Sequence, residues 1–99
     1  LSLAPFAEKW KAFGWNVLDI DGHNHDELRA ALNEAKQSTD KPTVIIANTV
    51  KGKGISFMEV DILWHYRFPH EGEEYDGALK ELHAAMPEGV VDLYEEGTK

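Results

Sequence analysis

The sequence predicts an α/β fold, in which helices alternate with parallel strands as in part of a doubly wound parallel sheet. Helical periodicity and short apolar runs follow one another in the order helix, strand, helix, strand, loop and helix. The second apolar run, TVIIANTV, is rich in β-branched residues and does not alternate, which is typical of a strand covered on both faces. A helix between two strands favours a crossover connection and therefore parallel pairing.

The first predicted helix covers residues 4–14 and leads into a short strand at residues 15–21. Gly14 suits the end of this helix. Its apolar residues recur at helical spacing: Phe6, Trp10 and Phe13.

The second predicted helix lies within residues 22–38. Asn24 is placed to cap its first turn, and Glu27, three residues later, is placed to reach back to the Asn24 amide, as in a capping box. Pro42 lies beyond the end of this pattern. The expected buried stripe consists of Leu28, Ala31, Leu32 and Ala35.

We expect residues 16–21 and 43–49 to pair as parallel neighbours. Two strands do not make a free-standing parallel sheet, so its other strands are expected to lie outside this sequence. Residues 51–71 predict a long loop with little periodicity, and residues 87–99 a partly helical or frayed end. Between them, residues 73–86 predict a third helix with one apolar face: Tyr75, Ala78, Leu79 and Leu82.

Composition limits the classes of function. A chain of 99 residues forms at most one small domain, and its start at Leu1 leads us to expect a piece of something longer. The net charge of −8 argues against general binding of nucleic acid or of anionic membranes. No apolar run approaches the roughly 20 residues that span a bilayer. Because cysteine is absent, we expect a cytoplasmic protein without disulfides or thiolate–metal sites.

The segment after the second predicted strand carries the main candidate site. Residues 49–70 have a net charge of +1, whereas residues 71–99 have −7 and are expected to form a solvated acidic surface. Ligands of open α/β sheets bind at the carboxyl ends of strands. Lys51 would place a positive charge there, and Gly52 and Gly54 would allow close approach to an anion or positive φ. This pattern suits a phosphate or diphosphate, although KGKG alone favours an ordinary solvated turn and does not match a Walker loop.

A second cluster of polar residues, DIDGHNHDE at positions 19–27, has the residue types of a metal site. Its spacing fits no EF-hand, and no HExxH frame is present. We therefore interpret it as a strand-to-helix turn and predict no metal ligands in these residues.

Four motifs occur in a fixed order: FGW at 13–15, DGH at 21–23, PTVIIANTVKGKG at 42–54 and WH at 64–65. Together they closely resemble the end of the thiamine-diphosphate-binding domain of transketolases. The resemblance runs from about Ala7 to about Pro69, and more loosely through the last helix. The sequence is most similar to the separately encoded N-terminal subunits of transketolase-like enzymes.

The resemblance implies roles for individual residues. Lys51 matches the family lysine near the cofactor diphosphate, in a loop that includes Gly52 and Gly54. His65, 14 positions later, matches the family histidine that contacts both the diphosphate and the sugar substrate. An imidazole can donate a hydrogen bond to a phosphate or hydroxyl oxygen and move protons near neutral pH, so His65 is also the catalytic candidate.

The sequence departs from the family pattern directly after this histidine. Many transketolases have glycine there, whereas Tyr66 and Arg67 follow His65 in this sequence. Arg67 is placed either to bind a sugar phosphate in a bidentate manner or to pair with an acidic neighbour. This departure leaves the expected cofactor unchanged, but it leaves the identity of the sugar substrate open.

The resemblance also implies the activity of an intact enzyme. Such an enzyme transfers a two-carbon ketol unit between sugar phosphates, using thiamine diphosphate and a divalent metal such as Mg²⁺. The family's Gly-Asp-Gly metal motif and its pyrimidine-binding domain have no counterpart here. Residues 1–99 are therefore expected to be the C-terminal part of one thiamine-diphosphate-binding domain and to be inactive alone.

The intact enzyme is expected to include a pyrimidine-binding subunit or domain and to be a dimer of such units. Two alternatives remain open from the sequence. One is another thiamine-diphosphate enzyme, such as a 1-deoxy-D-xylulose-5-phosphate synthase. The other is a stand-alone phosphate-binding or interaction module.

Overall fold

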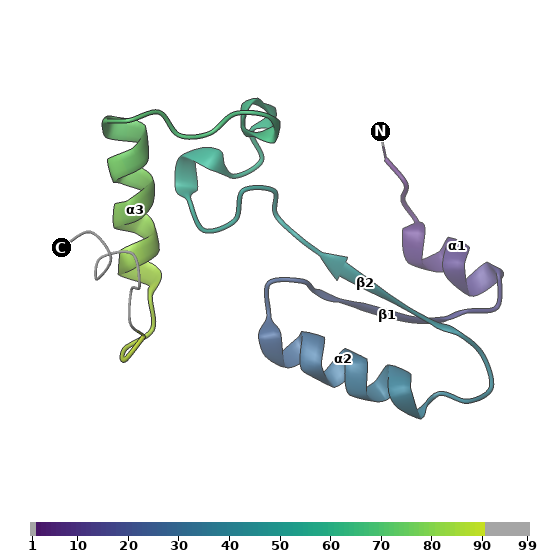
Figure 1. Ribbon diagram of the computed structural model, residues 1–99. Helices are drawn as coiled ribbons and strands as arrows, with labels where there is room; N and C mark the ends of the chain where they lie inside the picture. Colours follow the sequence, from purple (N-terminus) through teal and green to yellow (C-terminus); the bar gives the residue numbers. More distant parts are fainter. Residues whose placement is uncertain (1, 91–99) are drawn as a thin grey trace. The chain divides into compact units, whose positions relative to one another are not determined.

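A computed structural model of the chain describes residues 2–90. It divides into two compact units, with the boundary between Thr49 and Val50. The predicted α/β order of helix, strand, helix, strand, loop and helix is confirmed (Figure 1). The elements are α1 (Phe6–Ala12), β1 (Asn16–Asp21), α2 (His25–Gln37), β2 (Thr43–Asn48), the short 3₁₀ helices η1 (Ser56–Met58) and η2 (Ile62–His65), and α3 (Glu73–Ala85).

The two strands form a parallel pair, as predicted. Their register runs from Asn16 beside Thr43 to Asp21 beside Asn48, so β2 ends one residue earlier than expected. Helix α2 connects the strands and contacts both of them, while α1 contacts β1. The first unit is therefore a strand–helix–strand crossover with one additional helix.

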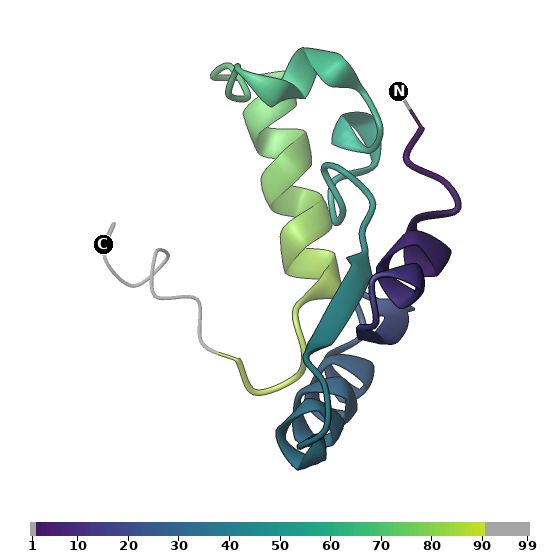
Figure 2. The same cartoon turned by 90° about the vertical axis from the view of Figure 1, so that its right-hand side faces the viewer.

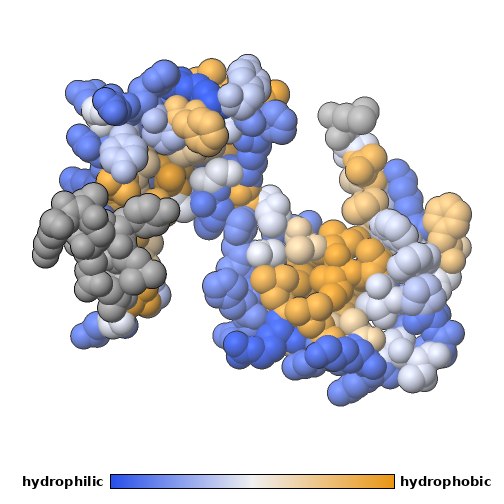
Figure 3. Space-filling model, viewed as in Figure 1, coloured by the Kyte–Doolittle hydropathy of each residue, from blue (hydrophilic) through white to orange (hydrophobic). Residues whose placement is uncertain are grey.

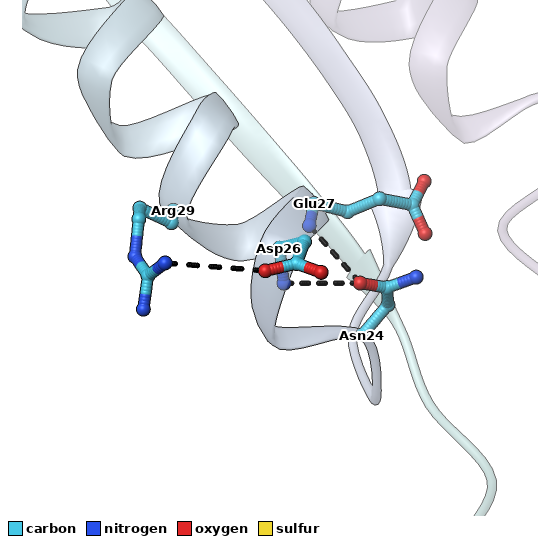
Figure 4. A network of polar contacts seen from close by, with 4 residues as sticks. All are labelled: Asn24, Asp26, Glu27 and Arg29. Carbon is cyan, nitrogen blue, oxygen red and sulfur yellow. Dashed lines mark hydrogen bonds and ion pairs between the residues drawn. The ribbon is translucent and has the colours of Figure 1, made fainter.

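Asn24 caps α2, as its position predicted. Its side-chain oxygen accepts hydrogen bonds from the backbone N–H groups of Asp26 and Glu27, at 3.0 and 3.1 Å (Figure 4). The reciprocal half of the predicted capping box does not form, because the Asn24 N–H donates to the Asp21 carbonyl at 3.2 Å instead. Figure 4 also shows the exposed ion pair of Asp26 with Arg29, which contributes little stability at 3.9 Å.

Helix α1 is shorter than predicted, and the chain leaves it through Gly14 at φ +87°, which agrees with the expected helix stop. The Trp10 ring packs edge-on against Phe6 and Trp15, at centroid distances of 6.0 and 4.9 Å. These contacts attach the helix to the start of β1. Phe13, expected on the same apolar face, is 83% exposed instead.

The described residues bury little of their apolar surface. Only Ala31 and Ala78 are buried among residues 2–90, at 3% and 5% exposure. The apolar side chains of both strands are half-buried, except that of Ala47, which is exposed. Figure 3 shows apolar surface gathered over the strand region of the first unit. The described residues therefore cover the strands only in part, because a two-stranded sheet has too few neighbours. Cover on both faces stays a prediction for the intact domain.

The predicted apolar faces of α2 and α3 are buried only in part. Ala31 and Ala78 are their centres, but Leu32 is 55% exposed and Leu82 and Tyr75 are also exposed. No helix in the described part of the chain is long and apolar enough to cross a membrane.

The segment predicted as an irregular loop contains η1 and η2, which corrects that prediction. A 3₁₀ turn of three or four residues is too short to produce a detectable periodicity. The described residues beyond α3, 86–90, are not helical, and the rest of the predicted C-terminal segment, residues 91–99, lies outside the described residues.

Candidate functional site

The segment that follows β2 folds back on itself. The Lys51 carbonyl accepts a hydrogen bond from the Val60 N–H at 2.8 Å, and the Met58 N–H donates to the Ile55 carbonyl at 2.9 Å. Val60 adopts φ +63°, a conformation that is rare for a β-branched residue. Residues 51–60 therefore form a closed loop, here called the lysine loop.

The two glycines of the lysine loop have positive φ for different reasons. Gly52 has φ +79°, and a Cβ there would lie 2.2 Å from the Met58 carbonyl oxygen. Gly54 has φ +106°, and a Cβ there would meet nothing within 4 Å. Gly52 is thus required for the loop to close on itself, whereas the space beside Gly54 is open. The Gly54 N–H donates a hydrogen bond to the Glu59 carboxylate at 3.4 Å.

Lys51 and His65 are both exposed. Among residues 2–90 the structure shows no hydrogen bond or ion pair from the Lys51 ammonium group, and none that joins it to His65. His65 is the last residue of η2, and its ring lies edge-on to Tyr66 at 6.4 Å. Asp61 caps η2 by accepting a hydrogen bond from the Leu63 N–H at 2.9 Å. Both candidate residues can therefore reach a bound molecule.

Arg67 is half-buried and paired with an acidic neighbour, the second of its two expected environments. Its Nη2 lies 2.6 Å from both carboxylate oxygens of Glu74, and its guanidinium lies 4.4 Å above the Trp64 ring. The Arg67 Nε is buried without a partner in the described residues. A substrate contact of Arg67 remains a prediction, but its guanidinium has a defined position beside α3.

Sequence reasoning missed a contact between Ser56 and Glu81. The Ser56 hydroxyl and N–H each donate a hydrogen bond to the Glu81 carboxylate at 2.5 Å. The hydroxyl bond, followed by the backbone bond, lowers the pKa of Glu81 from its usual value of 4.5. Glu74 and Glu81 thus correct the expectation that acidic residues beyond position 70 are only solvated. The seven-residue spacing of Glu74 and Glu81 places them on one face of a helix and was the available signal for these contacts. The other acidic residues nearby concealed it.

The acidic cluster at positions 19–27 forms a turn, as interpreted. The Asp21 carboxylate accepts a hydrogen bond from the His23 N–H at 2.9 Å, and Asn48 donates to the Asp19 carboxylate. A Cβ at Gly22 would lie 3.0 Å from the Asn48 carbonyl oxygen. Within residues 2–90 no three His, Cys, Asp or Glu side chains are grouped to hold a metal ion. The location of the metal ligands outside residues 1–99 stays a prediction.

The donors of the candidate site suit an anion. Lys51 contributes an ammonium group and His65 an imidazole, and the space beside Gly54 is open to a ligand. Ammonium and imidazole groups bind phosphate oxygens well and do not need a metal to do so. The residues present therefore fit a diphosphate group. Gly52 closes the loop, and its contact with the cofactor stays a prediction.

Comparisons with known proteins agree with this chemistry. Residues 4–65 match the family model described as "Transketolase, thiamine diphosphate binding domain". Over 63 residues the chain is 51% identical to the 6-deoxy-6-sulfo-D-fructose transketolase subunit SqwG of Clostridium sp. (strain MSTE9), covering 64% of this chain and 23% of that protein. Over 82 residues it is 34% identical to one of the subunits of the apulose-4-phosphate transketolase of Phocaeicola vulgatus, covering 83% and 29%.

A further relative is the mouse transketolase-like protein 2, which is 39% identical over 77 residues, 78% of this chain and 12% of that protein. The chain thus spans about a quarter of the length of the two bacterial subunits. The family match includes the lysine loop and ends at His65, so α3 lies beyond it. Because the match covers well over half of the residues, the chain belongs to the transketolase family, within its thiamine diphosphate-binding domain.

Proposed function

We propose that this chain supplies part of the thiamine diphosphate site of a transketolase-like enzyme, which transfers a two-carbon ketol unit between sugar phosphates. The observation that carries the proposal is the lysine loop, which exposes Lys51 and leaves the space beside Gly54 open, within the segment that matches the family. The bound cofactor supplies the carbanion chemistry, and the protein binds and orients it.

Each candidate residue has a distinct part in this proposal. Lys51 balances charge on the diphosphate, and Gly54 lets the backbone approach it. His65 donates a hydrogen bond to the diphosphate and moves a proton to or from the sugar. Arg67 is proposed to face the sugar phosphate from its position beside Glu74.

The same proposal extends to partners. Two relatives are named as subunits of apulose-4-phosphate transketolases, which supports a second, different subunit for this chain's enzyme as well. That partner would carry the pyrimidine-binding domain, the intact enzyme would be a dimer of such units, and the ligands of Mg²⁺ would lie outside residues 1–99. The rest of the domain would then cover the half-exposed strands. No observation favours a deoxyxylulose-phosphate synthase or a stand-alone module.

Substitution of Lys51 and His65 in the full-length enzyme tests the proposal. Lys51→Ala should weaken cofactor binding by about 1.5–3 kcal/mol, the contribution of one hydrogen bond to a charged group, and excess cofactor should restore the rate. His65→Ala should lower turnover roughly 100-fold or more, even at saturating cofactor, because a proton transfer is lost. Steady-state rates measured over a range of cofactor concentrations separate the two effects.

Lys53→Ala is the matched control, since Lys53 is an exposed lysine of the same loop. It should leave the turnover and the cofactor affinity within about twofold of the original enzyme, as expected for an exposed charge whose ammonium group makes no hydrogen bond or ion pair among residues 2–90. Full turnover of His65→Ala at saturating cofactor would restrict His65 to cofactor anchoring. If neither Lys51→Ala nor His65→Ala changes any parameter, the proposed function is wrong.

A further inference from the structure

Helix α3 presents two carboxylates to the segment that carries the candidate site. Glu74 and Glu81 are seven residues apart, which is close to two helical turns and puts them on one face. Glu81 binds Ser56 through two hydrogen bonds, and Glu74 binds Arg67 through two contacts of 2.6 Å. Figure 2 shows α3 running alongside the segment that contains η1 and η2.

The face between these carboxylates is made of small residues. A Cβ at Gly77 would lie 3.6 Å from the Phe57 ring, and Ala78 is only 5% exposed. Small side chains allow the backbone of α3 to approach η1 closely. The two glutamates therefore reach their partners without leaving the helix surface.

A continuous set of contacts joins the two carboxylates. Ser56, held by Glu81, begins η1 and precedes Phe57, whose ring packs edge-on against Trp64 at 5.6 Å. Trp64 in turn lies beneath the Arg67 guanidinium, which Glu74 holds. His65 directly follows Trp64, and Ser56 lies in the same loop as Lys51. These contacts therefore connect to the segments that carry both His65 and Lys51.

The segment needs such support because it has little backbone structure of its own. Between β2 and α3, the described residues form only two short 3₁₀ helices and a few isolated turn hydrogen bonds. Segments of this kind open locally unless side chains hold them. Hydrogen bonds to a carboxylate are stronger than those between neutral groups.

We propose that Glu74 and Glu81 are positioning residues: through Arg67 and Ser56 they hold the His65 segment and the lysine loop against α3. The proposal rests on the proposed function for the roles of His65 and Lys51, but not for the contacts that hold their segments. It assigns a role to a helix beyond the family match, which ends at residue 65.

The test compares Glu81→Ala and Glu74→Ala in the full-length protein. Alanine is the best helix former, so α3 should persist in both variants. The first readout needs no enzymatic activity. It is the rate of hydrogen exchange in peptides from residues 51–67, and limited tryptic cleavage of the folded protein after Lys53 and Arg67 is a parallel measurement. Each variant should speed exchange at its own end of the segment by about 10-fold, because the carboxylate contact that opposes local opening is lost. Exchange over residues 16–37 should not change.

Glu73→Ala is the control, because Glu73 is an exposed carboxylate of the same helix with no hydrogen bond or ion pair in the described residues. Ser56→Ala should speed exchange less than Glu81→Ala, because the Ser56 N–H still donates to Glu81, and it should add nothing when combined with Glu81→Ala. Ser56→Thr should retain slow exchange because it keeps the hydroxyl. Unchanged exchange in both glutamate variants, or equal acceleration in Glu73→Ala, would overturn the proposal.

The second readout separates this proposal from the proposed function. Glu74→Ala should lower turnover several-fold at saturating cofactor, and Glu81→Ala should mainly raise the cofactor concentration required. Faster exchange without either kinetic change would show that the two glutamates do not position the site. An enzyme without ketol transfer before any substitution would reject the proposed function, while the exchange data would still decide whether α3 holds the segment.

Discussion

The two units of this chain maintain their shapes by different kinds of interaction. In the first unit, a parallel ladder of six residues in each strand and a thirteen-residue helix supply regular backbone hydrogen bonds. In the described part of the second unit, the lysine loop and η2 depend on particular side chains. Backbone hydrogen bonds are available to any sequence, whereas a carboxylate clamp or a glycine contact depends on one residue. We therefore expect the lysine loop and η2, which carry the candidate site, to be more sensitive to single substitutions than the first unit.

Gly52→Ala should give the largest effect and would confirm that sensitivity. A residue with a Cβ loses about 1–2 kcal/mol at positive φ, and displacing the Met58 backbone adds about 1–3 kcal/mol. We therefore expect a loss of about 2–5 kcal/mol in the unfolding free energy, measured by urea denaturation of the full-length protein. In Gly54→Ala the added Cβ meets no neighbour, so this variant should lose only about 1–2 kcal/mol, the cost of a positive φ. Equal losses in both variants would show that the Met58 contact does not matter.

Asn24→Ala tests the first unit and should have a smaller effect. Losing the cap of α2 should cost about 1 kcal/mol, seen in urea denaturation and in faster exchange of the first turn of the helix. Asn24→Ser should retain most of this stability, because serine also caps helices. Glu27→Ala should change little, since the reciprocal bond of the capping box is absent. A larger loss in Glu27→Ala than in Asn24→Ala would contradict this description of the cap.

The pH dependence of the Ser56–Glu81 contact should be the smallest effect. Because folding lowers the pKa of Glu81, its charged form stabilises the folded state above pH 4.5, and this contribution is lost as the pH falls through the lower folded pKa. The urea midpoints of the original protein and Glu81→Gln should differ at about pH 6 and converge in stronger acid. A difference that grows on acidification would show the opposite sign and exclude the assigned cause of the shift.

Local sequence patterns predicted the order and type of the elements in the first unit, but not which apolar side chains they bury. Asn24 predicted the cap of α2, Gly14 the end of α1, and the β-branched run from Thr43 to Asn48 the parallel strand. Each of these features depends on residues a few positions apart, or on a periodicity that repeats along one element. The roles of Lys51 and His65 came from family resemblance and remain predictions.

The second unit was decided by the tertiary structure. Ser56 and Glu81 are 25 positions apart, and no local pattern selects this pair from the many acidic residues of the chain. The two glycines of KGKG are identical in sequence, yet the Met58 backbone makes only Gly52 indispensable for loop closure. Contacts of this kind arise when distant segments meet, and the energy of each depends on a geometry that exists only after the chain has folded.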